Sequence, residues 1–196
     1  EIQMMRKKPM LAYPVSNKPI DYTKPTFMQP KLDGVRCLIQ YDDGKVTAYS
    51  RTGKVWKNIE HITLGLYRFF DKYPNVILDG ELYNHDFKDD FESIISMVRK
   101  TKPTDEDRYI SAQNVHFHCY DIIDTNKTYE QRRNFIVQNL PIRDCINGVF
   151  TQLVSSEKEA KQFHKHSLEL GYEGSIVRIN DVYKCGRSWS LRKFKD

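Results

Sequence analysis

The 196-residue chain carries 31 Lys and Arg residues against 26 Asp and Glu residues, a formal net charge of +5 at pH 7. Its 39% hydrophobic and 29% charged residues are typical of a soluble globular protein, and its length favours one domain. No apolar run approaches the roughly 20 residues that span a membrane, and no signal peptide is visible. We therefore expect a soluble protein with no membrane partner.

Basic residues gather in two places, "MMRKKPM" (4–10) and "KCGRSWSLRKFKD" (184–196), the second with aromatic residues among them. Such clusters favour contact with phosphate groups, but two solvated chain ends have the same composition, so both interpretations stay open. The four cysteines lack the spacing of a zinc site or of a disulfide framework. Reduced thiols in a cytosolic protein are the simpler interpretation.

The first predicted elements are strands. An extended, proline-rich lead-in is expected over residues 1–25. The runs "VRCLIQY" (35–41) and "VTAYS" (46–50) flank the turn "DDGK" and predict a β-hairpin. Apolar residues at helical spacing in "NIEHITLGLYRFFDKYP" (58–74) predict a helix that stops at Pro74.

Strands and helices continue to alternate in the middle of the chain. The β-branched run "NVILDGELY" (75–83) predicts a strand, and "DFESIISMVRK" (90–100) predicts a short amphipathic helix. We expect a polar loop over "TKPTDEDR" (101–108) and a strand over "VHFHCYDII" (115–123).

The last third of the chain adds two helices and three strands. Helices are predicted over 128–140 and 156–171, and strands over 148–154, 174–179 and 190–195. Strand pairs interrupted by single helices, without regular βαβ alternation, favour an α+β domain with largely antiparallel sheets.

One short stretch, "QPKLDGVRC" (29–37), suggests chemistry. Pro30 restricts the backbone before Lys31, and Gly34 permits a close approach of another chain segment. If the stretch is extended, Lys31 and Asp33 project from the same side. A lysine held in this way suggests a nucleophile, although the pair alone also fits a surface ion pair worth at most about 1 kcal/mol.

Four further segments place charged groups beside glycine or at strand ends. They are "SRTGK" (50–54), "LDGELY" (78–83), "EGSIVR" (173–178) and "LRKFK" (191–195). With the aromatic residue before Asp in "CYDII", their order resembles the covalent nucleotidyltransferase family, which comprises ATP-dependent DNA ligases, RNA ligases and mRNA capping guanylyltransferases. The resemblance runs from about Gln29 to Lys195. It implies an ATP-grasp-like ligase adenylation domain over 26–196, α+β, with largely antiparallel sheets flanked by helices.

The resemblance implies catalytic roles for matching residues. Lys31 resembles the nucleophile that attacks the α-phosphate of ATP and carries AMP through a phosphoramidate bond. Arg36 resembles the arginine near the nucleotide, and Asp33 the aspartate that helps arrange the reacting ends. Lys193 and Lys195 resemble the pair that contacts the α-phosphate. Their like charges would also favour the neutral, nucleophilic form of the Lys31 amine.

Binding roles follow from the same resemblance. Glu81 resembles the carboxylate that binds the ribose, Tyr120 the aromatic residue that stacks on adenine, and Arg51 the arginine that receives the 5′-phosphate of a nick. Glu173, together with Glu81, is expected to bind Mg²⁺ or Mn²⁺, which take carboxylate, phosphate and water oxygens.

Gln29 and Pro30, directly before the nucleophile, are expected to line the nucleotide site. Many ligases carry glutamate where Gln29 stands, and there it accepts a hydrogen bond from the adenine amino group. A glutamine oxygen can accept the same bond, but its neutral amide leaves the base preference open.

The resemblance implies an enzyme, an ATP-dependent DNA ligase similar to small viral and phage ligases, of the kind that serves DNA replication, repair and recombination. It would form lysyl-AMP, transfer AMP to the 5′-phosphate of a nick in duplex DNA and seal the nick with the 3′-hydroxyl. An RNA ligase or capping-type enzyme, or a non-catalytic nucleic-acid-binding module, remain as alternatives.

The family context also gives expectations about partners. Because ligases continue past the last motif, we expect a C-terminal OB-fold to be absent from this chain. We expect a monomer in the cytoplasm, or in the nucleus or a viral replication compartment of a host cell.

Histidines receive simpler interpretations. His116 and His118 share a strand face, as metal ligands sometimes do, but no third ligand is placed beside them by the sequence. His164 and His166 lie in a charged helix and are expected to be solvated.

Overall fold

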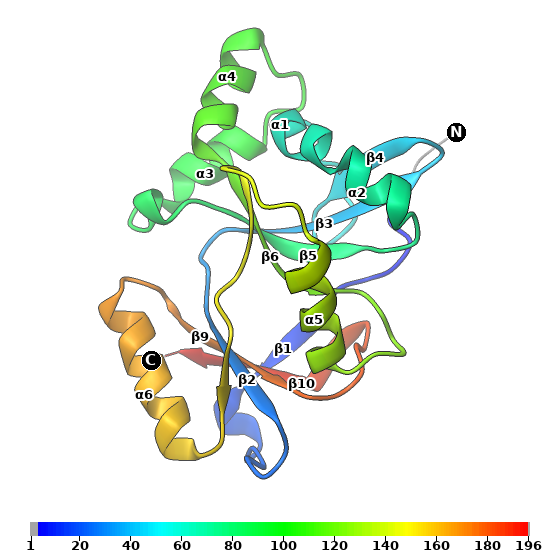
Figure 1. The fold of residues 1–196 in the computed structure, drawn as a ribbon. Coiled ribbons are helices and arrows are strands. Elements are labelled where there is room, and N and C mark those ends of the chain that lie inside the picture. Colours follow the sequence, from blue (N-terminus) through cyan, green and yellow to red (C-terminus); the bar gives the residue numbers. More distant parts are fainter. Residues whose placement is uncertain (1–3, 196) are drawn as a thin grey trace.

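The chain forms two five-stranded sheets, one above the other in Figure 1, and the computed structural model describes residues 4–195. The lower sheet has the order β1-β10-β9-β2-β8. Its strands are β1 (Met10–Pro14), β2 (Thr26–Pro30), β8 (Gln152–Val154), β9 (Gly174–Ile179) and β10 (Gly186–Lys195). The upper sheet has the order β4-β3-β5-β6-β7. Its strands are β3 (Val35–Asp42), β4 (Lys45–Tyr49), β5 (Leu78–Tyr83), β6 (His116–Ile122) and β7 (Ile146–Gly148).

Helices flank both sheets. The α-helices are α1 (Glu60–Thr63), α2 (Tyr67–Lys72), α3 (Phe91–Val98), α4 (Asp105–Asn114), α5 (Tyr129–Asn139) and α6 (Glu157–Glu169). Three short 3-10 helices are η1 (Val15–Asn17), η2 (Leu64–Leu66) and η3 (His85–Phe87). The helices α1 to α4 lie with the upper sheet, α5 packs on β6, and α6 packs on β9 and β2 (Figure 1).

The strand pairings confirm the expected fold class. Every pairing between named strands is antiparallel except β1 with β10 and β6 with β7. The expected hairpin is formed by β3 and β4, which pair antiparallel. The fold is therefore α+β, with largely antiparallel sheets flanked by helices. None of the helices among the described residues is long and apolar enough to cross a membrane.

Strand β3 is buried on both faces and joins the two layers. Cys37 and Ile39 belong to the large apolar cluster between the upper sheet and its helices, which also holds Phe69 and Phe70. Leu38 points the other way, into a smaller cluster with residues of β1 and β10. The alternation follows the two-residue period of a strand. Burial of these apolar side chains therefore fixes the two sheets against each other and shapes the space between them.

The lead-in expected over residues 1–25 contains β1. The segment is extended as expected, but it pairs in parallel with β10, from Met10 opposite Gly186 to Pro14 opposite Lys193. These residues thus form an edge strand of the lower sheet. Residues 1–3 of the lead-in, and residue 196 at the end of the expected domain 26–196, lie outside the described residues.

The prediction of a polar loop over 101–108 is wrong in its second half, because α4 begins at Asp105. Thr104 accepts a hydrogen bond from the Asp107 backbone N–H at 3.1 Å, and the Asp107 carboxylate accepts one from the Thr104 backbone N–H at 2.9 Å. This reciprocal pair is a capping box in which aspartate takes the place of the usual glutamate. The cap satisfies two N–H groups that a helix start leaves unpaired, so a polar sequence still forms a helix.

Two other expected elements are divided. The single strand expected over 148–154 is two short strands, β7 in the upper sheet and β8 in the lower one, because the chain crosses between the sheets there. The helix expected over 58–74 is split into α1, η2 and α2. The split falls around Gly65, and glycine is unfavourable inside an α-helix.

His164 is buried, so its expected solvation is wrong. Only 5% of the residue is exposed, its Nδ1 lies 2.9 Å from Ser175 Oγ, and its ring stacks on Phe194 with the centroids 3.9 Å apart. The inner face of α6 consists of Ala160, Phe163, His164 and Ser167. These positions follow the i, i+3, i+4, i+7 spacing of a helix face that packs on a sheet.

Candidate nucleotide-binding site

A cavity of about 300 Å³ opens between the two sheets, with walls from both of them. All the predicted site residues line this cavity except Asp33, Glu173 and Lys195. Those three lie beside Lys31, where Glu173 and both lysines influence the ionisation of Asp33. Burial raises the pKa of Asp33, and Glu173 raises it further. The structure therefore brings together residues that are far apart in the sequence.

Lys31 and Lys195 share one carboxylate. The Nζ atom of Lys31 lies 2.8 Å from Glu173 Oε2, and Lys195 pairs with Glu173 Oε1. The backbone N–H of Lys31 donates to the Gly174 carbonyl at 2.9 Å, which ties the nucleophile loop to the start of β9. Although partial burial acts in the opposite direction, hydrogen bonds from Lys195 and Lys31 lower the pKa of Glu173. Glu173 is thus ionised at neutral pH.

Arg36 is fixed by a buried partner, Asp79, which was not among the predicted site residues. Its guanidinium binds Asp79 through two hydrogen bonds, Nε to Oδ1 at 2.7 Å and Nη2 to Oδ2 at 2.8 Å. The Tyr183 hydroxyl donates to the same Oδ2 at 2.7 Å, and the Met10 carbonyl accepts from Arg36 Nη2 at 2.9 Å. Such two-point pairs are geometrically specific, so the direction of Arg36 in the cavity is set before any ligand binds.

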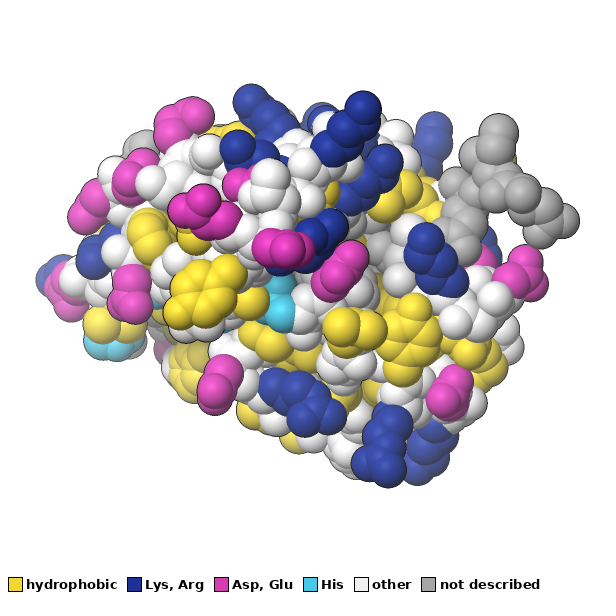
Figure 2. Space-filling view, turned by 90° about the horizontal axis from the view of Figure 1, so that it is seen from above, with side chains coloured by type: hydrophobic (Ala, Val, Ile, Leu, Met, Phe, Trp, Pro, Cys, Tyr) yellow, Lys and Arg dark blue, Asp and Glu magenta, His cyan; other side chains and the backbone are white. Residues whose placement is uncertain are grey.

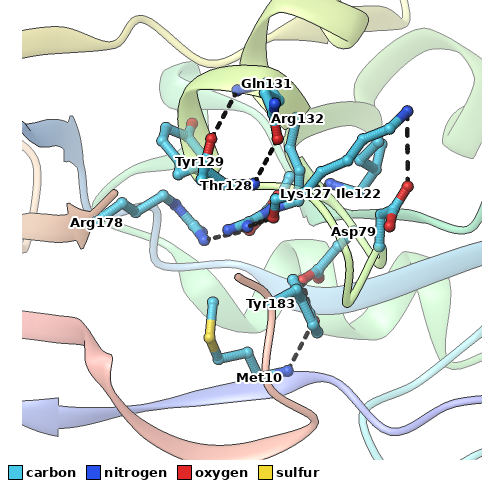
Figure 3. A network of polar contacts seen from close by, with 12 residues as sticks. Met10, Asp79, Ile122, Lys127, Thr128, Tyr129, Gln131, Arg132, Arg178 and Tyr183 are labelled. Atoms are coloured by element: carbon cyan, nitrogen blue, oxygen red, sulfur yellow. Dashed lines mark hydrogen bonds and ion pairs between the residues drawn. The ribbon is translucent and has the colours of Figure 1, made fainter. Parts of the chain in front are cut away.

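Asp79 and Tyr183 both lie in segments that carry a sequence signal, but neither residue was predicted to belong to the site. Asp79 precedes glycine in the "LDGELY" segment, and Tyr183 directly precedes the basic run "KCGRSWSLRKFKD". Figure 3 shows Tyr183 between Asp79 and the backbone of Met10, whose N–H donates to the Tyr183 hydroxyl at 2.7 Å. This tyrosine connects β1 to β5.

Glu81 is a half-buried carboxyl group on the same face of β5 as Asp79. Its Oε1 accepts from the Tyr120 hydroxyl at 3.0 Å, and its Oε2 accepts from the Gly34 N–H at 3.3 Å. Burial raises the pKa of Glu81 to about 7, against the opposing effect of Arg36. Gly34 is required here, since a Cβ atom would lie 2.1 Å from the Leu82 carbonyl oxygen. The close approach places the Glu81 carboxyl and the Tyr120 ring at one wall of the cavity.

Because the pKa of Glu81 is raised in the folded chain, we expect the free energy of unfolding to depend on pH. Because the folded chain holds this proton more tightly than the unfolded chain does, the group contributes stability below about pH 4.5 and loses it as pH rises to about 7. The contribution of Glu81 to the free energy of unfolding that is lost over this pH range is roughly 3 kcal/mol. In Glu81→Gln we expect this loss to vanish, since an amide can donate to Tyr120 and accept from Gly34. Urea unfolding of both proteins at pH 5 and pH 7.5 measures it.

The pH dependence of stability must be compared between wild type and variant, because His118 changes the free energy of unfolding with pH in the opposite direction. Burial lowers the pKa of His118 to about 4, so His118 makes the fold more stable as pH rises from about 4 to about 6.5. The exposed Glu106 provides the control, and Glu106→Gln is expected to keep the wild-type pH dependence. An equal pH dependence in wild type and Glu81→Gln would contradict the assignment.

Gln29 sits at the inner end of the cavity with its amide already engaged. Its Oε1 accepts from Arg178 Nε at 2.7 Å, and its Nε2 donates to the Tyr129 hydroxyl at 2.8 Å. Arg178 Nη1 donates to Asp121 Oδ2 at 2.9 Å, and Asp121 Oδ1 accepts from Arg132 Nε at 2.7 Å. The oxygen that was expected to face an adenine amino group therefore faces a buried arginine.

Among the residues that the structure describes, the two histidines of β6 belong to no candidate metal site. Within residues 4–195, no group of three or more His, Cys, Asp or Glu side chains is arranged to hold a metal ion. His116 and His118 lie near each other, with ring centroids 6.2 Å apart, as their shared strand face predicted. The four cysteines are free thiols.

The charged side chains that line the cavity are mainly basic, whereas the face seen from above in Figure 2, on the side of the upper sheet, carries charges of both signs. In Figure 2 that face shows acidic and basic side chains interspersed with hydrophobic ones. A surface of mixed charge attracts a polyanion weakly, because the opposing charges offset each other. The cavity between the sheets is lined by Lys31, Arg51, Arg187 and Lys193. The arrangement is suited to binding phosphate groups.

Comparison with known proteins agrees with the geometry. A family model described as "ATP dependent DNA ligase domain" matches residues 9–195. A DNA ligase of African swine fever virus is 30% identical over 171 residues, which cover 81% of this chain and 38% of that protein. The chain thus spans well under half the length of this viral relative.

Two solved structures illustrate the similarity of fold. The structure named "Pmar-Lig_PreS3" covers 100% of this chain and 47% of its own, with a TM-score of 0.77 and 21% identity. The ATP-dependent DNA ligase of bacteriophage T7, solved in complex with ATP, covers 96% of this chain and 68% of its own, with a TM-score of 0.72 and 18% identity. The adenylation-type fold is therefore shared.

Proposed function

Since the chain belongs to the ATP-dependent DNA ligase domain family, we propose that it is the adenylation domain of a DNA ligase and that Lys31 carries the covalent AMP. The observation that supports this proposal best is the position of Lys31. Its amine lies at a cavity lined by arginine and lysine, with Glu173 and Lys195 beside it.

The proposed reaction transfers AMP from ATP to the Lys31 amine. The Lys31 ammonium first loses a proton to water, and its lone pair then attacks the α-phosphorus of ATP. A P–N bond forms, the bond from the α-phosphorus to the bridging oxygen breaks, pyrophosphate leaves, and the nitrogen releases its second proton to water. Phosphoryl-type transfer depends mainly on in-line placement and charge neutralisation. We assign these tasks to Arg36, which Asp79 holds rigidly, and to Lys193 and Lys195.

The residues fit a divalent cation. Glu173 is an ionised carboxylate beside the proposed nucleophile, and hard cations such as Mg²⁺ or Mn²⁺ combine one or two carboxylates with phosphate and water oxygens. Glu173 would hold the ion, which would supply charge neutralisation at the phosphates. A Glu173 carboxylate bound to a cation would stabilise the Lys31 ammonium less, which would favour the neutral amine.

The nucleotide is proposed to lie along the cavity wall. Tyr120 presents its ring for stacking on the base, and Glu81 presents a carboxyl group for the ribose. Gln29 and Pro30 close the inner end, and Arg51 is proposed to receive the 5′-phosphate of nicked duplex DNA. We propose that the chain acts as a monomer and that the longer protein includes a C-terminal OB-fold which assists closure over the nucleotide.

Two assays test the function. This chain, incubated with ATP or GTP labelled at the α-phosphate and with Mg²⁺, is expected to take up label from ATP only, and slowly without a second domain. The full-length protein is expected to seal nicked DNA. Exclusive labelling by GTP would indicate a capping-type enzyme, sealing of nicked RNA alone an RNA ligase, and no labelling at all a non-catalytic module.

A further inference from the structure

His85, the first residue of η3, uses both ring nitrogens close to the proposed reaction centre. Its Nε2 lies 2.8 Å from the Leu170 carbonyl oxygen, and its Nδ1 lies 2.7 Å from the Tyr83 hydroxyl. A carbonyl only accepts, so Nε2 carries the hydrogen in its contact with Leu170. The ring also stacks on Tyr172, with the centroids 4.1 Å apart and the planes at 22°. His85 therefore joins the end of β5 to the segment that follows α6.

That segment, residues 170–173, ends at Glu173. Within it Gly171 has φ of +91°, and a Cβ atom there would lie 2.7 Å from Lys88 Cδ. The segment is thus pressed against the chain that follows β5. Tyr172, which stacks on His85, directly precedes Glu173. A displacement of the stacked ring would move the carboxylate that pairs with the two lysines.

The same end of β5 supports the loop that carries Lys31. The Gly34 N–H donates to Glu81, and only a glycine fits at position 34 because the Leu82 carbonyl is so close. Residues 81–85 consequently contact both loops, the one with the nucleophile and the one with its carboxylate partner.

We propose that His85 is a positioning residue that sets the place of Glu173 relative to Lys31. The proposal rests on the proposed function, because it takes Lys31 as the reacting amine. A misplacement of about 1 Å remote from the chemistry can cost about 100-fold in rate. A ring that contributed stability alone would leave the rate per folded molecule unchanged.

The test uses two variants and a matched histidine. His85→Ala is expected to lower the rate of self-adenylation per folded molecule by about 10-fold to 100-fold, and to raise the Mg²⁺ concentration that gives half the maximal rate. His85→Gln is expected to retain part of the rate, since its amide can donate to Leu170. The His166 side chain is 68% exposed and its Nδ1 lies 3.8 Å from Glu169 Oε2, so His166→Ala is expected to stay within twofold of wild type. A rate for His85→Ala within twofold of wild type overturns the proposal.

A second measurement does not depend on activity. The Lys31 N–H donates to the Gly174 carbonyl, next to Glu173, so a displaced segment would expose it. Faster hydrogen exchange at this amide in His85→Ala is expected, with unchanged exchange in His166→Ala. If wild type forms no covalent AMP, the proposed function fails and exchange alone decides the role of His85. Unchanged exchange would then overturn it.

Discussion

Lys31→Arg is expected to abolish transfer of AMP to the protein while leaving the fold intact. Arginine keeps the positive charge and can bind Glu173, but its guanidinium stays protonated and offers no lone pair to phosphorus. Removing the nucleophile should lower the rate of self-adenylation by at least about 1,000-fold. Uptake of label from α-labelled ATP, followed on denaturing gels, measures this rate.

The control for charge and side-chain length is Lys161→Arg on α6, where the lysine pairs at the surface with Glu157. This variant should adenylate at the wild-type rate. Equal unfolding free energies of the two variants would show that the loss in Lys31→Arg is chemical. Normal labelling of Lys31→Arg would mean that another residue carries the nucleotide.

Asp121→Asn is expected to destabilise the fold by about 3–5 kcal/mol. Asp121 is fully buried and compensates both Arg132 and Arg178, so the change leaves two buried guanidinium groups without their counter-ion. The change should also disturb nucleotide binding, because Arg178 holds Gln29 at the inner end of the cavity. Urea unfolding at pH 7 measures the free energy.

The matched control is Asp105→Asn, which breaks an Asp–Arg pair on the surface of α4. Asp105 is fully exposed and pairs with Arg108 one turn away, and exposed pairs contribute at most about 1 kcal/mol. Similar losses in the two variants would show that the buried cluster does not depend on Asp121.

The site was predictable to the extent that its motifs are local. Lys31 and Glu173 lie 142 positions apart in the sequence and 2.8 Å apart in the fold. Both residues were predicted from short motifs, because each motif combines charged groups with glycine or a strand end. The contact between them depends on how the two sheets pack, which a local motif does not determine. The supporting residues Tyr183 and His85 were missed for the same reason.

The fold was predictable where periodicity is strong and less so where tertiary contacts decide. The hairpin of β3 and β4 agrees with its pattern. By contrast, α4 depends on a capping box hidden in a polar run, and the chain at 149–151 changes sheets within one β-favouring segment. The helical spacing of Ala160, Phe163, His164 and Ser167 is consistent with the burial of His164. The many charged residues of α6 led instead to the prediction that His164 is solvated.

The sequence only weakly indicates the buried cluster formed by Asp121, Arg132 and Arg178. Asp121 and Arg178 each interrupt an apolar strand, where a charge is costly unless it is paired. The sequence offers no way to pair them, since their partners come from different sheets. The structure shows that Arg178 also donates a hydrogen bond to the Gln29 oxygen.

Peptide mapping by mass spectrometry of the intact chain, after incubation with ATP and Mg²⁺, tests the central claim most directly. The digestion is carried out at neutral or alkaline pH, since phosphoramidates are labile in acid. We expect one AMP group, located on the peptide that contains Lys31. AMP on a different lysine, or AMP bound without a covalent bond to the chain, would contradict the account.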